Sequence, residues 1–406
     1  MGSPVNISLL EEATLLTITS GTGRTIPLNC NVNETDLYPA AQLSLVDTLF
    51  ADGWTKVQAY SRACFDAQSS TGPYISTEHT ARDMLRITQA LGDGKTNYFG
   101  TSYGTQLGQT FASLFPNKVG RFLLDAVVNP LDYVAGPKYT WLADTDKVYD
   151  SFFLECASFP LQLPAPHPPG HHHLLASPQH HRPFPPRPRP PLHPRQPPPL
   201  PPHHLLPPFV YRTIKESLIR GTLYNPTLWP RLATALTSFL NGTDQTGTSP
   251  PPLAQPRFFP QVTPTPSTPS PASPAPTAPS WRITSPDALL PPSVRAQQRT
   301  SFFSNTFYDI ATWPCAAWEI QIATAVSGPL LLLLLLPPSA FNASALFEGS
   351  RVLVHERFGH GLFADPSRCV RERVRAYFVE GRLPEEGDRC RADRRPFEGG
   401  GEARWI

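Results

Sequence analysis

The sequence predicts an α/β fold in which helices cover both faces of a mostly parallel sheet. Residues 77–130 have the order helix, strand, helix, strand, as expected for a parallel sheet between helical layers. The second of these strands, Arg121–Val128, is an almost continuous apolar run (RFLLDAVV), which is typical of a buried parallel strand. The first strand, which starts near Thr96, runs directly into a Gly-x-Ser-x-Gly turn between Gly100 and Gly104.

The two helices of this unit have clear local signals. Thr77–Leu91 is predicted as an amphipathic helix with Thr77 as its cap and Gly92 as its stop. Its apolar face contains Ala81, Met84, Ile87 and Leu91. The second helix, Tyr103–Phe115, ends at a proline.

The Gly-x-Ser-x-Gly turn points to nucleophilic catalysis by Ser102. A serine on a sharp turn between strand and helix exposes its hydroxyl at the edge of the sheet. Gly100 and Gly104 lack a Cβ, so the strand and the helix can approach closely. The start of the helix offers unpaired N–H groups to a developing oxyanion. The alternative is a tight structural turn with a solvated serine.

A serine nucleophile needs a base, and the best candidate is His360. Nine of the 12 histidines lie in residues 160–208, which leaves His79, His355 and His360. His79 falls in the first turn of a helix and is expected to be exposed, while His355 ends a strand predicted for Arg351–Val354. His360 lies in the loop Phe358–Gly361, after the last predicted strand, where this kind of fold carries its base.

The acid of a catalytic triad is not identified by the sequence. It should follow a strand near Leu330–Leu336, but the next residues, Pro337–Ser344, contain no carboxylate. Glu348 comes too close to the last strand, and Asp125 is a conceivable substitute for which a structural role is favoured. Without an acid the rate falls by about 10⁴-fold, because the imidazolium loses its partner.

Composition limits the remaining possibilities. The formal net charge of +2 argues against nucleic acid as the main partner, and no segment is long and apolar enough to span a bilayer. No signal peptide is visible in the N-terminal residues. The six cysteines and four glycosylation sequons nevertheless favour a secreted protein. The sequons begin at Asn6, Asn33, Asn241 and Asn342. No metal and no cofactor is expected.

Two tracts divide the chain. Residues 160–208 contain 20 of the 51 prolines and residues 250–279 contain 12 more, so both are predicted to be disordered. Other helices are predicted at Ala41–Phe65, at Tyr211–Arg220 and Pro226–Leu240 between the tracts, and at Ser367–Glu380. The predicted organisation is a poorly defined N-terminus (1–20), a core with the Ser102 turn (21–130), a cap region (131–315), a C-terminal part of the core (316–395) and a tail (396–406).

These motifs resemble the secreted tripeptidyl-aminopeptidase-like branch of the proline iminopeptidases, which are α/β-hydrolases with a TAP-like C-terminal domain. The residues that carry the resemblance cover somewhat over half of the chain. They are GTGRTIPLNC (21–30), TEHTARDMLRITQALG (77–92), YFGTSYGTQLGQTFASLFPNKVGRFLLDAVVNP (98–130), the helices of 210–240, LFEGSRVLV (346–354), FGHG (358–361) and CVRERVRAYFVEGRLPEEGDRC (369–390).

The resemblance implies an α/β-hydrolase fold with a helical cap and a serine exopeptidase activity. Ser102 would be the nucleophile, His360 the base, and the Tyr103 backbone N–H half of the oxyanion hole. Cys369 would pair with Cys390, and Cys30 with Cys64. The substrate would be a peptide, from whose free N-terminus short peptides or single residues are released through an acyl-enzyme. An esterase on the same fold is an alternative, and so is a non-catalytic protein.

The sequence departs from the family pattern in three places. The family's N-terminal strands and glycine-rich oxyanion loop are absent before Gly21, so the core is expected to be truncated. The acid motif is replaced by leucines, and the cap is interrupted by the proline-rich tracts. Cys156 and Cys315 lack their usual partners. We hypothesise an imperfect gene prediction that joins exons of the family through foreign sequence, which transcript sequencing across these junctions tests.

Overall fold

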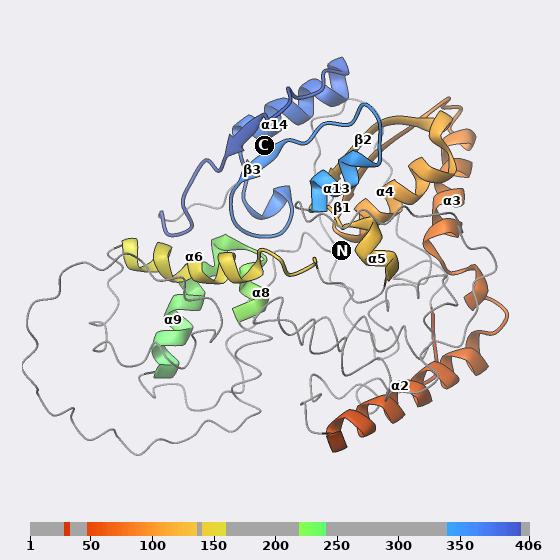
Figure 1. Cartoon of the computed structure of the whole chain (residues 1–406), viewed down its shortest axis with the longest axis horizontal. Helices are drawn as coiled ribbons and strands as arrows, with labels where there is room; N and C mark the ends of the chain where they lie inside the picture. The colour runs from red at the N-terminus through yellow and green to blue at the C-terminus, as the bar shows by residue number, and fades with distance from the viewer. Residues whose placement is uncertain (1–27, 33–46, 136–139, 160–218, 241–338, 399–406) are drawn as a thin grey trace, which may run out of the picture.

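The computed structural model describes residues 28–32, 47–135, 140–159, 219–240 and 339–398 (Figure 1). Several sequence predictions lie outside these residues. They are the N-terminus (1–20), the two proline-rich tracts, the leucine run that precedes the expected acid, Cys315, and the sequons at Asn6, Asn33 and Asn241.

A strand–helix–strand unit forms the centre of the fold. Strand β1 (Thr96–Thr101) leads into helix α4 (Tyr103–Leu114), and β2 (Val119–Asp125) returns beside β1 in parallel. The register pairs Thr101 at the end of β1 with Asp125 at the end of β2. The predicted parallel pairing is confirmed. Both carboxyl ends therefore lie at one edge of the sheet, which is where parallel α/β folds place their functional groups.

Helix α3 (Thr77–Ala90) packs against α4 and encloses a small apolar core. Its buried members include Ala81 and Met84 from α3 and Leu107 and Phe111 from α4. The predicted helix is confirmed, but its cap is wrong. Ser76, not Thr77, is the N-cap, and its hydroxyl accepts the His79 N–H. Thr77 is already the first helical residue, and its hydroxyl is hydrogen-bonded to the Tyr103 hydroxyl at 2.8 Å.

Strand β2 ends earlier than the sequence predicts, at Asp125 rather than Val128. Ala126 has a positive φ of 54°, which breaks the extended conformation. The Val128 N–H then bonds to the Thr105 hydroxyl at 2.9 Å rather than to a neighbouring strand. The strand is also less buried than expected, because most of its residues are only half-buried. On one edge the Phe122 N–H bonds to the Tyr377 hydroxyl at 3.0 Å.

Two further segments flank this unit on its N-terminal side. Helix α2 (Asp47–Gln68) is followed by a 3-10 turn, η1 (Gly72–Tyr74), that leads into α3. A disulfide joins Cys30 to Cys64 at the end of α2, and both cysteines are buried beside Leu28 and Tyr60. This bond attaches the described N-terminal residues to the helix.

After β2 the chain enters a group of helices. It starts with α5 (Pro130–Ala135) and continues in α6 (Thr145–Ser158), α8 (Arg220–Leu223), the 3-10 turn η5 (Pro226–Leu228) and α9 (Trp229–Leu240). We call α6, α8, η5 and α9 the helical cluster. In Figure 1 it lies on the left of the molecule, opposite β1 and β2. Trp229 and Leu232 are fully buried at its centre, beside Phe152 of α6.

The C-terminal part contains a second parallel pair of strands. Its elements are α13 (Ser339–Ala345), β3 (Val354–Glu356), the 3-10 turn η8 (Leu362–Ala364), α14 (Arg368–Arg375), a π-helical turn η9 (Ala376–Glu380) and β4 (Arg389–Arg391). The helix predicted for Ser367–Glu380 corresponds to α14 and η9, with Ser367 as its N-cap and Gly381 in the left-handed conformation at its end.

Strand β3 is displaced from the prediction, and β4 was not predicted. The prediction of Arg351–Val354 is wrong, because the pairing with β4 begins only at Val354 and continues through His355 and Glu356. Strand β4 lies in a charged stretch without apolar alternation, so it has none of the period-2 pattern that indicates a strand. A disulfide and ion pairs, rather than apolar packing, hold β4 in place.

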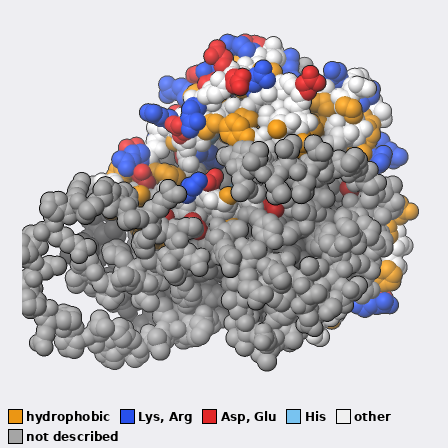
Figure 2. Space-filling view, in the orientation of Figure 1, with side chains coloured by type: hydrophobic (Ala, Val, Ile, Leu, Met, Phe, Trp, Pro, Cys, Tyr) orange, Lys and Arg blue, Asp and Glu red, His pale blue; other side chains and the backbone are white. Residues whose placement is uncertain are grey.

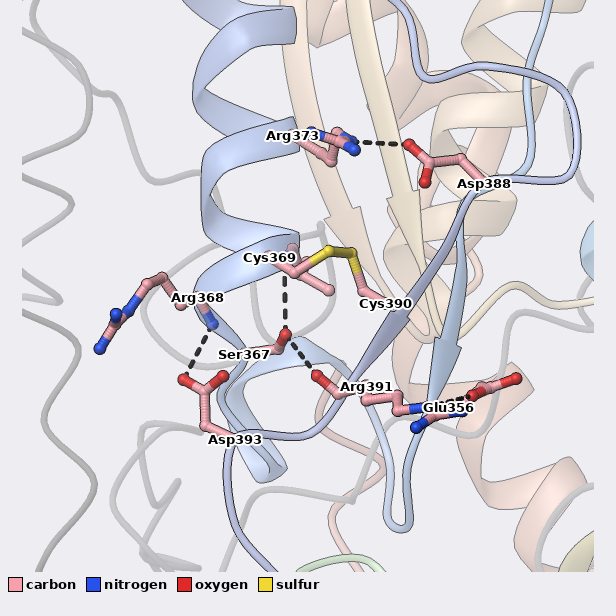
Figure 3. The surroundings of a disulfide bond; sticks show 10 residues. Glu356, Ser367, Arg368, Cys369, Arg373, Asp388, Cys390, Arg391 and Asp393 are labelled. Carbon is pink, nitrogen blue, oxygen red and sulfur yellow. Dashed lines mark hydrogen bonds and ion pairs between the residues drawn. A yellow bond between two sulfur atoms is a disulfide. The ribbon is translucent and has the colours of Figure 1, made fainter.

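A disulfide and several ion pairs hold this second pair of strands (Figure 3). Cys369 of α14 is bonded to Cys390 of β4, and the Ser367 hydroxyl donates to the Arg391 carbonyl at 2.6 Å. Glu356 binds Arg389 at 2.6 Å. Figure 2 shows arginine, lysine and carboxylate side chains intermingled over this part of the surface. No helix among the described residues is both long enough and apolar enough to cross a bilayer.

Candidate active site

Ser102 stands at the junction of β1 and α4 in a conformation that few residues adopt. Its φ is 59° and its ψ is −121°, far from the favourable regions for a residue with a side chain. Such a conformation costs about 1–3 kcal/mol and persists only where the surroundings enforce it. Here the Ser102 N–H donates to the Asp125 carbonyl at 3.0 Å, and the Ser102 carbonyl accepts the Thr105 hydroxyl at 2.7 Å.

Gly100 permits a close approach of strand and helix that a residue with a Cβ would not allow, and Gly104 leaves room for the Tyr98 hydroxyl. A Cβ on Gly100 would lie 2.5 Å from the Gly104 carbonyl oxygen and 2.5 Å from the Tyr98 ring. On Gly104 it would lie 3.2 Å from the Tyr98 hydroxyl, which donates to the Gly104 carbonyl at 2.7 Å. The sequence reasoning named the glycines, while the tyrosine that fills the space between strand and helix was missed.

Tyr103 is the first residue of α4, so its backbone N–H has no acceptor within the helix. Its side chain is used elsewhere, because the hydroxyl is hydrogen-bonded to the Thr77 hydroxyl at 2.8 Å. Burial raises the pKa of Tyr103 to about 12. The Tyr103 side chain is therefore a structural contact between α3 and α4, so the oxyanion role predicted for Tyr103 can rest only on its backbone N–H.

The loop that carries His360 is fixed by hydrogen bonds on both sides of the histidine. The His360 N–H donates to the Tyr224 carbonyl at 2.9 Å, and the Leu362 N–H donates to the Asp125 carboxylate at 2.6 Å. Phe358, two residues earlier, packs on Trp229 with 4.9 Å between ring centroids. The loop is thus anchored to the helical cluster at one end and to β2 at the other.

Gly361 brings the His360 loop directly against the end of β1. A Cβ on Gly361 would lie 2.9 Å from the Thr101 side chain and 3.0 Å from the Asp125 carboxylate. Thr101 directly precedes Ser102, and Gly361 directly follows His360. The contact between Thr101 and Gly361 therefore brings the backbone of the serine close to the backbone of the histidine. Within the described residues no hydrogen bond joins the Ser102 hydroxyl to the His360 ring.

His360 is half-buried, and its surroundings favour the neutral imidazole. Burial lowers its pKa to about 4, and the nearby positive charge of Arg357 lowers it further in the same direction. A neutral ring at neutral pH is the form that can accept a proton. His79, by contrast, is half-buried rather than exposed and is hydrogen-bonded to the Ser76 hydroxyl at 2.9 Å.

Arg357, directly before the loop, is a charged residue near the site that sequence reasoning missed, and its guanidinium donates to the Phe358 carbonyl at 3.2 Å. Burial lowers its pKa, while Asp125 and Asp365 favour its charge. Burial raises the pKa of Asp365 to about 6, and it also raises the pKa of Asp125, opposed by the Leu362 hydrogen bond. Asp125 lies far from Arg357 and Asp365 in the sequence. The only sequence signal for this group was that charged residues flank the FGHG loop.

Asp125 does not act on His360 in the manner of a triad acid. Its carboxylate is occupied by the Leu362 N–H and, more distantly, by the Thr101 hydroxyl at 3.5 Å. No carboxylate of the described segments is hydrogen-bonded to the His360 ring. The acid was expected directly after the leucine run. The structure describes this segment only from Ser339 onward.

The remaining predicted positions are distributed around this centre. Asn342 is half-buried in α13. The structure joins Cys30 to Cys64 and Cys369 to Cys390, the two pairs that the resemblance implied. Cys156 is in no disulfide with the described residues, and burial raises the pKa of its thiol.

Comparison with known proteins gives matches in two parts of the chain. Residues 27–166 match the family described as alpha/beta hydrolase fold, and residues 337–390 match the family described as TAP-like protein. The first match contains the Ser102 turn and the second contains His360. The strand order and the parallel pairing described above are consistent with the alpha/beta hydrolase fold.

Curated relatives align over shorter stretches. A tripeptidyl aminopeptidase from Streptomyces lividans is 37% identical over 113 residues, which is 27% of this chain and 21% of the relative. The tripeptidyl aminopeptidase of Streptomyces coelicolor gives the same values. The serine protease Hip1 of Mycobacterium tuberculosis is 42% identical over 57 residues, which is 14% of this chain and 11% of that protein. The aligned part spans about a fifth or less of these relatives.

Proposed function

We propose that this chain, which belongs to the α/β hydrolases and carries a TAP-like C-terminal part, is a serine hydrolase that acts on peptides. One observation carries the proposal. Ser102 is held at a positive φ between β1 and α4, and the residue after His360 packs against the residue before Ser102. A nucleophile and a base on neighbouring loops at the carboxyl ends of parallel strands are the parts that acyl transfer requires.

In the proposed reaction the neutral His360 imidazole takes the proton of the Ser102 hydroxyl as the oxygen attacks the substrate carbonyl. The negative charge that develops on the carbonyl oxygen accepts a hydrogen bond from the Tyr103 N–H. The imidazolium then gives its proton to the leaving amine, and the acyl group stays on Ser102. Water, deprotonated by His360, releases the acyl group and restores the serine.

The finer proposal is an exopeptidase that releases short peptides or single residues from free N-termini. It is supported by the tripeptidyl aminopeptidases among the relatives, which align with this chain over 113 residues. The helical cluster would act as the cap that shapes the substrate site, since Phe358 and Tyr224 connect it to the His360 loop. A secreted protein is proposed because two disulfides join distant segments, as is usual in oxidising compartments.

The test compares substrates that differ only at the amino terminus. A tripeptide p-nitroanilide with a free amine, the same compound acetylated, and a p-nitrophenyl ester are offered to the full chain and to Ser102→Ala. The exopeptidase proposal expects turnover of the free tripeptide that is lost on acetylation and absent in Ser102→Ala. Equal cleavage of the acetylated peptide contradicts an exopeptidase. Turnover of the ester alone supports an esterase instead.

A non-catalytic protein is separated by a different reagent. A fluorophosphonate reacts with activated serines whatever their substrate, so it labels an exopeptidase and an esterase alike. Labelling that disappears in Ser102→Ala supports a hydrolase. A chain that stays unlabelled, although its disulfides are intact, contradicts the proposed function as a whole.

A further inference from the structure

Tyr224 touches His360 in two independent ways. Its backbone carbonyl accepts the His360 N–H at 2.9 Å, and its ring faces the imidazole with 4.8 Å between centroids and 53° between planes. Tyr224 comes from the helical cluster, immediately after α8, whereas His360 lies more than a hundred residues further along the chain. The contact therefore joins two parts of the fold at the candidate base.

The segment around Tyr224 is held firmly enough to impose a position. Thr222 and Leu223 before it are buried, and Leu228 and Trp229 after it are buried as well. Between them the Asn225 side chain caps η5 by accepting the Thr227 N–H at 3.0 Å. The Tyr224 side chain itself is 37% exposed, so it contributes little to this core. Packing into the core therefore does not explain why the Tyr224 ring lies against His360.

The loop on the other side is equally close. A Cβ on Gly359 would lie 2.8 Å from the Tyr224 carbonyl oxygen and 2.7 Å from the Pro226 ring. The loop therefore contacts the segment 224–226 at Gly359 and at the His360 N–H, directly before and at the histidine.

We propose that Tyr224 is a positioning residue, which covers one face of the His360 imidazole and fixes its orientation toward Ser102. The inference rests on the proposed function, because it assigns His360 the role of the base. The proposal also connects the helical cluster to catalysis. A substrate that shifts this cluster would change the orientation of the His360 ring through Tyr224.

The groups that face His360 determine what removal of the Tyr224 ring does. The Tyr224 ring lies against it from the helical cluster, and the charge of Arg357, directly after β3, acts on it. The Asp125 carboxylate contacts the loop two residues later, at the Leu362 N–H. Burial is the main cause of the low pKa of His360, ahead of the charge of Arg357. Removal of the ring admits water to the imidazole, so its pKa rises toward the ordinary value.

The test measures the titration of His360 directly, on the full chain with ¹³C-labelled histidine rings. Three variants are compared with the wild type: Tyr224→Ala, Tyr224→Phe and Tyr74→Ala. His360→Gln identifies the resonance. Tyr74 is a matched control, because its ring contacts another histidine, His79, with 5.5 Å between centroids. We expect Tyr224→Ala to raise the titration midpoint of His360 by about half a pH unit or more.

The other variants distinguish positioning from a general structural effect. Tyr224→Phe keeps the ring and should leave the midpoint of His360 unchanged, and so should Tyr74→Ala, whose ring lies elsewhere. The rate of fluorophosphonate labelling of Ser102 should fall about tenfold in Tyr224→Ala, a typical effect for a misplaced base, and recover in Tyr224→Phe.

Two outcomes overturn the inference: an unchanged His360 midpoint in Tyr224→Ala, or an equal change in Tyr224→Phe. A failure of the proposed function looks different. If the wild-type chain is not labelled at Ser102, the hydrolase proposal is contradicted, while the titration of His360 still decides whether Tyr224 holds the imidazole.

Discussion

Replacement of Asp125 by Asn tests whether this carboxylate holds the His360 loop in place. The side chain is 8% exposed and accepts the Leu362 N–H at 2.6 Å. Asparagine has nearly the same shape but no charge. The substitution therefore weakens one hydrogen bond and removes one of the two carboxylates whose charges favour the charged form of the half-buried Arg357.

The expected magnitude follows from these contacts. A hydrogen bond to a charged group contributes about 1.5–3 kcal/mol and a neutral one about 0.5–1.5 kcal/mol, so the bond itself loses about 1 kcal/mol. The charge of Arg357 adds a cost of similar size, since Asp365 still compensates it in part. A total of about 1–2 kcal/mol corresponds to a fall in Tm of about 2–8 °C. If the loop also moves in the transition state, the labelling of Ser102 slows about 5- to 30-fold.

The assay combines thermal unfolding, followed by circular dichroism, with the rate of fluorophosphonate labelling at Ser102. The matched control is Asp144→Asn, which also removes an ion-paired carboxylate, but one on the surface, 2.5 Å from Lys147. The control should change neither quantity. Because burial raises the pKa of Asp125, the folded chain binds this proton more tightly than the unfolded chain, so the wild type gains stability as the carboxyl protonates in acid. Asp125→Asn lacks this gain, and the difference in Tm between the two should widen as the pH falls. An unchanged Tm together with an unchanged labelling rate in Asp125→Asn refutes the anchoring role.

Three further predictions concern the turn, the second pair of strands and the disulfide. Gly100→Ala should abolish labelling of Ser102, because the new Cβ meets a backbone carbonyl at 2.5 Å, whereas Gly94→Ala meets nothing within 4 Å and should be silent. His355→Leu should raise Tm by removing two buried ring nitrogens without partners, which cost about 1 kcal/mol or more. Cys369→Ser should lower the free energy of unfolding by about 3 kcal/mol, since the bond closes a loop with a sequence separation of 21.

The outcomes that contradict these predictions are equally specific. Full labelling of Gly100→Ala means that β1 and α4 are not in contact at the turn. For His355 the sign of the pH dependence is a further check. Burial lowers its pKa to about 4, so the unfolded chain binds more protons between about pH 6.5 and 4, and the wild type loses stability as pH falls through this range. The gain from His355→Leu should therefore be larger at pH 5 than at pH 8, and a constant gain contradicts the argument. An unchanged stability of Cys369→Ser under oxidising conditions excludes the bond.

The strand–turn–helix around Ser102 could be predicted because its signals are local. Gly100 and Gly104 mark the close approach, the apolar run of β2 marks the strand, and the periodicity of α3 marks the packing face. Even there, the predicted end of a strand was wrong where a single backbone angle determines it. Ala126 ends β2 through its positive φ, and nothing in its side chain indicates this.

The surroundings of His360 could be predicted only in part. The FGHG loop identified the histidine by its place after the last strand. The residues that hold the loop are Tyr224 and Asp125, and they lie more than a hundred residues away in the chain. A contact of that kind leaves no periodic or local pattern. Strand β4 escaped for a related reason, because ion pairs and a disulfide, rather than apolar alternation, hold it.

The central claim is that Ser102 is a nucleophile activated by its turn and by His360. The most direct measurement treats the full, oxidised chain with a fluorophosphonate, digests it, and locates the adduct by mass spectrometry in the wild type, Ser102→Ala and His360→Gln. We expect a single adduct on Ser102 in the wild type, none in Ser102→Ala, and labelling slowed by a factor on the order of 10³ or more in His360→Gln. An adduct on another residue, or a rate that is the same without the histidine, contradicts this claim.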